Sequence, residues 1–172
     1  GFHDAGTRRT RLTRYRRCRS RQRPWFANPS RYRSAVWISP LAHMLDTSIA
    51  IHARDVTEAV LDKLAKQDGS VLLSALSLAE LQRGLYKDPA VTSLRQVRLN
   101  TILDAIAIVP FGAVAAVVYG QIIAQCGWIK GRDFDRMIAA HAIATDSVLV
   151  TNNMKDFRNI PGLTLENWIV TS

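Results

Sequence analysis

The stretch Gly131–Phe157, GRDFDRMIAAHAIATDSVLVTNNMKDF, decides the fold because it joins a helix, a short strand and a polar turn. Two carboxylates, Asp133 and Asp135, stand at the start of the predicted helix 134–144, and an apolar strand follows at 147–150. A short apolar strand directly after an amphipathic helix is typical of an α/β fold. The strand ends in a turn with three polar side chains, which are Asn152, Asn153 and Asp156.

The chain before and after this stretch repeats the same alternation. We predict further strands at residues 41–45, 71–74, 106–109 and 163–165, and further helices at residues 49–53, 57–66, 78–85, 93–105 and 114–125. Thr47 or Ser48 is expected to cap the first of these helices. In the helix 93–105, the side chains expected to face the core are Leu94, Val97 and Ile102. Short buried strands between helices predict an α/β fold with a mostly parallel sheet that is covered on both faces.

Positive charge is concentrated in the first quarter of the chain. Residues 1–43 carry eleven Arg and one acid, Asp4, for a net charge of +10. Residues 44–172 carry twelve Lys and Arg against thirteen Asp and Glu, for a net charge of −1. The total of +9 therefore describes the Arg-rich segment. We predict an Arg-rich extension at 1–43 and a folded domain at 44–172.

Three interpretations of the extension remain open. The favoured one is that the functional protein starts at Met44, where the composition changes abruptly. The second is a disordered tail with too little apolar surface to fold. The third is a nucleic-acid-binding arm, because clustered Arg side chains bind phosphate backbones.

The cysteines and the hydropathy of the chain indicate in which cellular compartment the protein is expected. The two cysteines, Cys18 and Cys126, form neither a metal-binding spacing nor a disulfide framework, which is typical of a reducing compartment such as the cytoplasm. No apolar run reaches the roughly 18–20 residues of a membrane span. We therefore expect a cytoplasmic protein without a membrane partner.

Four carboxylates recur at the ends of predicted elements. Asp46 follows a strand, Glu80 and Asp135 lie in the first turns of helices, and Asp156 follows a strand and a turn. In a parallel sheet all four fall near the carboxyl edge, where α/β folds build their sites. Clustered carboxylates repel one another unless a cation lies among them, and Mg²⁺ or Mn²⁺ prefers such oxygen ligands. The cluster favours metal-dependent hydrolysis of phosphodiesters.

Each acid also has a purely structural explanation. Ser77 and Glu80 match a capping box, S-x-x-E, so Glu80 can serve only to cap its helix. Asp133 is expected to be an N-cap, and Asp135 is favoured in the first turn by the helix dipole. A solvated cap and an ordinary turn residue are the alternatives for the other two acids, Asp46 and Asp156.

The histidines do not form a metal site in this interpretation. His141 lies six residues past Asp135, so it projects from a different side of the helix, and we expect a packed or hydrogen-bonded side chain. His43 and His52 flank Asp46, but no second histidine stands at a zinc-like spacing. Zinc is therefore not expected.

Five segments, in this order, resemble the PIN-domain ribonucleases of the VapC-type toxins. They are MLDTSIAI at 44–51, LSLAELQRG at 76–84, FDRMIAAHA at 134–142, LVTNN at 149–153 with the following Asp156 and Phe157, and GLTLENW at 162–168. The resemblance excludes the Arg-rich segment. It implies a PIN-like α/β/α sandwich and a Mg²⁺- or Mn²⁺-dependent endoribonuclease, the toxin of a type II toxin–antitoxin pair.

The resemblance also assigns roles to single residues. The three positions that match the family's core acids, and so its catalytic and metal-binding residues, are Asp46, Glu80 and Asp135. Many relatives have a fourth acid where this chain has Asn153, so the resemblance implies that Asp156 supplies the missing charge, with Asn153 as a neutral ligand. Asp133 is a weaker candidate for this role. Thr151 is expected to hydrogen-bond within the cluster.

The implied partners are a cognate antitoxin, an RNA substrate and a second copy of the chain. Four side chains are expected to bring positive charge to RNA, and they are Arg83, Lys130, Arg132 and Arg136. A solvated surface and an antitoxin-binding rim are equal alternatives for them. The alternative function is a catalytically decayed PIN-like module that binds a partner, with Asn153 marking the decay. A second alternative is a basic nucleic-acid-binding protein whose Arg-rich arm is the active element.

Overall fold

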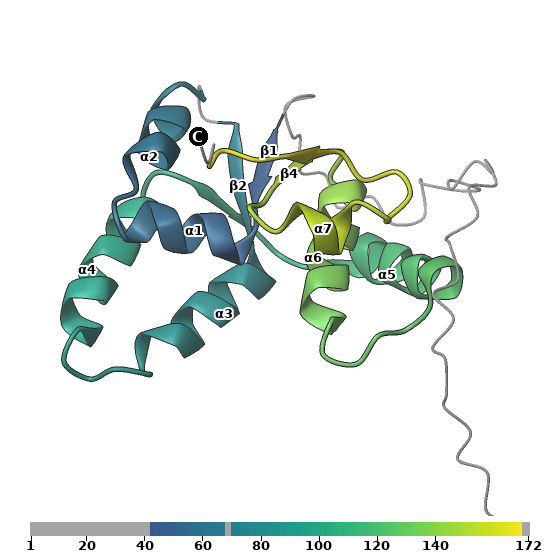
Figure 1. The fold of residues 1–172 in the computed structure, drawn as a ribbon, viewed down its shortest axis with the longest axis horizontal. Coiled ribbons are helices and arrows are strands. Elements are labelled where there is room, and N and C mark those ends of the chain that lie inside the picture. Colours follow the sequence, from purple (N-terminus) through teal and green to yellow (C-terminus); the bar gives the residue numbers. More distant parts are fainter. Residues whose placement is uncertain (1–41, 68–69, 170–172) are drawn as a thin grey trace, which may run out of the picture.

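Five parallel strands form the centre of the molecule, in the order β3-β2-β1-β4-β5 across the sheet (Figure 1). This computed structural model describes residues 42–67 and 70–169, so the predictions for Cys18 and the Arg-rich extension lie outside the described residues. The strands are β1 His43–Leu45, β2 Val71–Ser74, β3 Ala107–Val109, β4 Val148–Val150 and β5 Leu165–Glu166. The predicted parallel sheet is thus confirmed.

The three central strands are apolar because both faces of the sheet are covered. Met44 is in register with Leu72 and Leu149, and these three side chains pack into one core cluster. The next residue of each strand turns to the other face, where a second cluster contains Leu45, Leu73 and Val150. Alternate side chains of a strand point to opposite faces, so a strand buried on both sides is apolar throughout.

Helices cover the two faces of the sheet in two groups (Figure 1). Helices α1 Thr47–Arg54, α2 Glu58–Ala65, α3 Ala75–Leu85 and α4 Thr92–Leu103 contribute Ile49, Val60, Leu81 and Leu99 to the core of one face. Helices α5 Ala113–Cys126, α6 Asp133–Ala144 and α7 Met154–Phe157 contribute Ile122, Ile138 and Phe157 to the core of the other face. The predicted α/β/α sandwich is confirmed. Within the described residues, no helix is long and apolar enough to cross a bilayer.

The first turns of three helices differ from the sequence prediction. Strand β2 passes directly into α3, and the N-cap is Ser74, whose Oγ accepts a 3.1 Å hydrogen bond from the Leu76 N–H group. Ser77 lies inside α3, buried, with no hydrogen-bond partner for its Oγ among the described residues. The predicted capping box is therefore wrong, and Glu80 lies beyond the first turn of α3.

The other two corrections concern α1 and α6. Asp46 itself is the N-cap of α1, in place of the predicted Thr47 or Ser48. The N-cap position of α6 is held by Arg132, so Asp133 is the first residue of the helix rather than its cap. In addition, the segment after Asn153 forms the short helix α7 where the sequence predicted a turn.

The core-facing side of α4 is also different from the prediction. Leu94 and Val97 are 52% and 64% exposed, whereas Leu99 is buried and Ile102 packs against the same cluster. Five residues of helix turn the side chain by about 140°, so Leu94 and Leu99 cannot face the same core. The spacing of apolar residues in α4 is compatible with either of two helix faces being buried, and only the packing against α1 and α3 selects one of them.

Candidate active site

The carboxyl ends of three neighbouring strands supply the polar residues of the candidate site. Asp46 follows β1, Ser74 ends β2, and Thr151 follows β4. The chain runs from β1 to one side of the sheet through β2 and β3, and later to the other side through β4 and β5. In a parallel α/β sheet such a change of direction opens a crevice at the carboxyl ends of the strands, where ligands bind.

Asp46 is buried at this point and accepts three hydrogen bonds. They come from the backbone N–H of Thr47 at 2.8 Å, the hydroxyl of Ser48 at 2.8 Å and the hydroxyl of Thr151 at 2.9 Å. Burial raises the pKa of Asp46, the three hydrogen bonds oppose this shift, and the charge of Asp135 adds to it. Three donors thus hold the carboxylate in position, although burial disfavours its charged form.

Glu80 is linked to Asp46 through Thr47. The Thr47 hydroxyl donates a 2.7 Å hydrogen bond to Glu80 Oε2, while its backbone N–H group binds Asp46. The other oxygen, Oε1, accepts a longer hydrogen bond of 3.4 Å from Arg83, one turn along α3. One threonine therefore fixes two of the predicted acids from different elements, β1 and α3.

Asp135 and Asp156 share one cation, Arg132. The Arg132 guanidinium donates to Asp135 Oδ2 at 3.0 Å and also to Asp156 Oδ2. Burial would raise the pKa of Asp156, but the hydrogen bonds from Arg132 and Asn153 outweigh it and lower the pKa of this carboxyl. The sequence pattern predicts RNA or antitoxin binding for Arg132 and does not reveal this pairing, although Arg132 and Asp135 stand at the helical spacing i, i+3.

Thr151 and Asn153 join the two pairs of acids. The Asn153 N–H group donates a 3.0 Å hydrogen bond to Thr151 Oγ1, whose own proton goes to Asp46. The Asn153 side-chain amide donates to Asp156. A continuous series of contacts thus connects the four predicted acids, and its members in order are Glu80, Thr47, Asp46, Thr151, Asn153, Asp156, Arg132 and Asp135.

The donor set of this cluster fits a hard divalent cation. It consists of carboxylate, hydroxyl and amide oxygens, which suit Mg²⁺ and Mn²⁺. Burial, and to a smaller extent the charge of Asp135, raises the pKa of Asp46, and a bound cation would stabilise its charged form. Among residues 42–67 and 70–169, no three His, Cys, Asp or Glu side chains are grouped as in a metal site. Instead, the single positive charge of Arg132 is shared between Asp135 and Asp156.

His141 supports the site from the core, as the sequence predicted for a packed histidine. Its Nδ1 lies 2.9 Å from the Oγ of Ser74, the N-cap of α3, and its ring meets Phe111 edge to face at 5.6 Å. Burial lowers the pKa of His141 to about 4, so the ring is neutral at physiological pH. It therefore helps to fix the start of the helix that carries Glu80.

Two further residues do not have the roles that the sequence predicted for them. Arg136 is buried, with no partner for its Nη1 atom in the described part of the chain, so the prediction that it presents charge to RNA is wrong. Asp133 Oδ1 accepts hydrogen bonds from Tyr119 Oη at 2.8 Å and Trp128 Nε1 at 3.0 Å, and no contact joins it to the other acids. Asp133 thus anchors the loop between α5 and α6.

Comparison with known sequences places this chain in a family. The family profile described as PIN domain matches residues 43–163. The chain is 38% identical to "Ribonuclease VapC2" of Rickettsia felis over 135 residues, which are 74% of this chain and 98% of that protein. It is 32% identical to "tRNA(fMet)-specific endonuclease VapC" of Shigella flexneri over 132 residues, again 74% and 98% of the two chains.

Solved structures give the same result. The VapBC2 complex of Rickettsia felis, bound to a DNA fragment from its promoter, has a chain that matches with a TM-score of 0.67 and 35% identity, covering 75% of this chain and all of that one. The DNA-bound VapBC complex of Salmonella typhimurium matches with a TM-score of 0.68 and 27% identity over 75% and 99% of the two chains. The chain belongs to the PIN domain family and, within it, is related to the VapC ribonucleases.

Proposed function

We propose that this protein is an endoribonuclease toxin of the VapC type, which hydrolyses RNA phosphodiester bonds with a Mg²⁺ or Mn²⁺ ion held by Asp46, Glu80 and Asp135. The observation that carries the proposal is the continuous series of contacts that joins these three acids and Asp156 at the carboxyl edge of the sheet. The names of the similar proteins, ribonuclease and tRNA endonuclease, support RNA as the substrate class.

The chain's own residues position the reacting groups. Thr47 and Thr151 hold the carboxylates of Glu80 and Asp46 by their hydroxyl protons, so that neither side chain turns freely. A divalent cation bound there would lower the pKa of a water molecule and neutralise charge on the phosphate. Asp156 supplies the fourth negative charge in place of an acid at 153, and Asn153 holds it by its amide.

The same proposal includes the partners. Similar chains occur in VapBC complexes, and one related structure of lower identity is described as a toxin–antitoxin complex, which supports a cognate antitoxin for this protein. We further propose a homodimer that acts on RNA in the cytoplasm. Single-stranded segments and loops are the expected substrates, because their backbone can enter a recessed acidic site.

Cleavage of RNA by the purified full chain tests the proposal. Labelled single-stranded RNA is incubated with Mn²⁺, with Mg²⁺ and with EDTA, beside the variant Glu80→Gln and the control Glu58→Gln, an exposed acid at the start of α2. We expect cleavage only with a divalent ion, complete loss in Glu80→Gln and unchanged cleavage in Glu58→Gln. Equal cleavage by wild type and Glu80→Gln would exclude the assigned site.

The alternative is a decayed PIN-like module that docks a partner without cutting RNA. Asn153 favours it, because an amide stands where many relatives carry an acid. Thermal unfolding with and without Mn²⁺ separates the two functions, since a ligand that binds only the folded state raises its stability by mass action. A concentration-dependent rise in Tm that is lost in Glu80→Gln supports the enzyme, and no rise supports the decayed module.

The proposed catalytic domain spans 44–172, and truncation tests whether the Arg-rich segment contributes. The cut is best made before Ala42, because this residue is buried in the core and His43 already belongs to β1. RNA affinity is compared between residues 1–172 and 42–172 across salt concentrations. If the segment binds RNA, its removal lowers the affinity and reduces the salt dependence; equal curves assign binding to the domain.

A further inference from the structure

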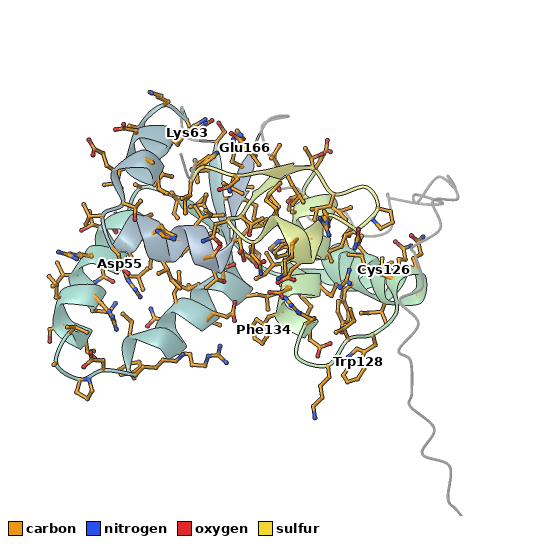
Figure 2. All side chains as sticks on the ribbon, in the orientation of Figure 1. Asp55, Lys63, Cys126, Trp128, Phe134 and Glu166 are labelled. Atoms are coloured by element: carbon orange, nitrogen blue, oxygen red, sulfur yellow. The ribbon has the colours of Figure 1, made fainter. Side chains whose placement is uncertain are left out.

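The loop between α5 and α6 presents a large aromatic side chain to solvent. Trp128 is 60% exposed, and Figure 2 shows it on the lower side of the molecule, near the start of α6. Gly127 and Gly131, with φ angles of 78° and 80°, bracket it in the left-handed region that favours glycine. The chain therefore holds an indole ring on a tightly turned loop, outside the core.

The indole is fixed rather than free to rotate. Its Nε1 donates a 3.0 Å hydrogen bond to Asp133 Oδ1, and the Tyr119 hydroxyl donates to the same oxygen at 2.8 Å. The hydrogen bond at Nε1 lies in the plane of the ring, so it leaves the ring faces available for stacking. An aromatic ring whose edge is anchored and whose side chain is exposed loses little conformational freedom when a flat ligand binds.

Cationic side chains share this loop with Trp128. Lys130 is exposed and forms no ion pair with the described residues, and Arg132 leads from the loop to Asp135 and Asp156. Phe134, 39% exposed, follows in the first turn of α6. An aromatic platform beside a positively charged backbone contact is the combination by which proteins bind single-stranded nucleic acids.

The loop also lies close to the proposed reaction. Asp133, which anchors Trp128, and Asp135 are two residues apart in α6, and their side chains project about 200° apart around the helix axis. Trp128, through its hydrogen bond to Asp133, and Asp135 thus lie on different sides of the first turn of α6.

We propose that Trp128 is a stacking platform for one unpaired nucleobase of the RNA substrate. The inference rests on the proposed function and names a residue that selects single-stranded RNA. Lys130 binds the phosphate backbone beside that base. The fixed ring favours a flat nucleobase over an antitoxin peptide, and a protein partner at this loop is an outcome that the test distinguishes.

The affinity of the full chain for a fluorescein-labelled single-stranded RNA, measured by anisotropy in EDTA, tests the platform without cleavage. The variants are Trp128→Ala and Trp128→Phe, and the control is Tyr86→Ala, which removes a more exposed aromatic side chain (71%) at the end of α3. We expect a loss of about 5- to 150-fold for Trp128→Ala, because stacking contributes about 1–3 kcal/mol per base. Trp128→Phe should retain most of the affinity, and Tyr86→Ala all of it.

A scan of abasic positions through the same RNA identifies the stacked base. If the platform exists, one abasic position weakens binding to wild type and has no effect on Trp128→Ala, so the two changes are not additive. Equal affinity of Trp128→Ala and wild type, with matched Tm, overturns the platform, and loss of affinity for a VapB-type antitoxin in that variant would then assign the loop to a protein. Cleavage by wild type in Mn²⁺, measured in parallel, keeps this result separate from failure of the proposed function.

Discussion

The hydroxyl of Thr151 donates a 2.9 Å hydrogen bond to Asp46 Oδ2, across 105 residues of sequence. Both groups are buried, and the bond joins the carboxyl ends of β1 and β4, which are neighbours in the sheet. The same Thr151 oxygen accepts the N–H group of Asn153. This contact therefore ties the first acid of the site to the turn that carries Asn153 and leads to Asp156.

Replacing Thr151 with Val should weaken both folding and activity. The change leaves the Asn153 N–H group without its acceptor and removes one donor from Asp46, so we expect a loss of about 1–3 kcal/mol in the free energy of unfolding. It should also raise the pKa of Asp46 further, because that donor stabilises the charged form. The acidic limb of the pH–rate profile then moves to higher pH. Thr101→Val, an exposed threonine of α4, is the control and should change neither quantity.

Asp135→Asn should abolish cleavage and leave the fold intact. Its side chain is 32% exposed, so the unfolding free energy should change by no more than about 0.5 kcal/mol. Loss of an acid from the cluster should lower the cleavage rate at least about 100-fold. Asp62→Asn, an exposed acid of α2, is the matched control for charge. Growth after induced expression without antitoxin gives a second measurement, and arrest by a folded Asp135→Asn variant would remove Asp135 from the mechanism.

Arg132→Gln should bind Mn²⁺ more tightly than wild type. The guanidinium pairs with both Asp135 and Asp156, so its removal leaves two carboxylates without a positive partner and available for a cation. Half-exposed ion pairs contribute up to about 1 kcal/mol each, and we therefore expect a gain of roughly 3- to 10-fold in affinity by calorimetry. Arg158→Gln removes an exposed positive charge after α7 and controls for net charge. Equal affinities for the two variants would show that Arg132 does not compete with the metal.

His141 should make the folded protein less stable in mild acid. Burial lowers the pKa of His141 from the ordinary histidine value of 6.5 to about 4, so between these two pH values the unfolded chain binds a proton that the folded chain does not. The free energy of unfolding contributed by this group should fall as pH drops from about 7 to 4 and level off below, by roughly 3 kcal/mol at most. His141→Gln, which can still hydrogen-bond Ser74, should flatten the pH dependence of unfolding over this range. An unchanged pH dependence in a folded His141→Gln variant would show that His141 is not its source.

Much of the fold was predictable because it depends on local patterns. The short apolar runs that form β1, β2 and β4 are sufficient to predict buried parallel strands. The helix starts were predicted less accurately, since Ser74, Ser77 and Asp133 are all residue types that favour the N-cap position. Only the exit of the chain from β2 decides between Ser74 and Ser77, and only the bonds from Tyr119 and Trp128 show what Asp133 holds.

The sequence by itself determined the residue types of the site and its place at the carboxyl edge of a parallel sheet. Asp46, Glu80, Asp135 and Asp156 were each identifiable from their position after a strand or in the helix that follows one. The tertiary structure alone decided that Arg132 turns inward to pair with two of these acids while Arg136 is buried. Both arginines lie in or next to the first turn of α6. Their environments differ because charge pairing and burial depend on neighbours from distant segments of the chain, which a local sequence pattern does not identify.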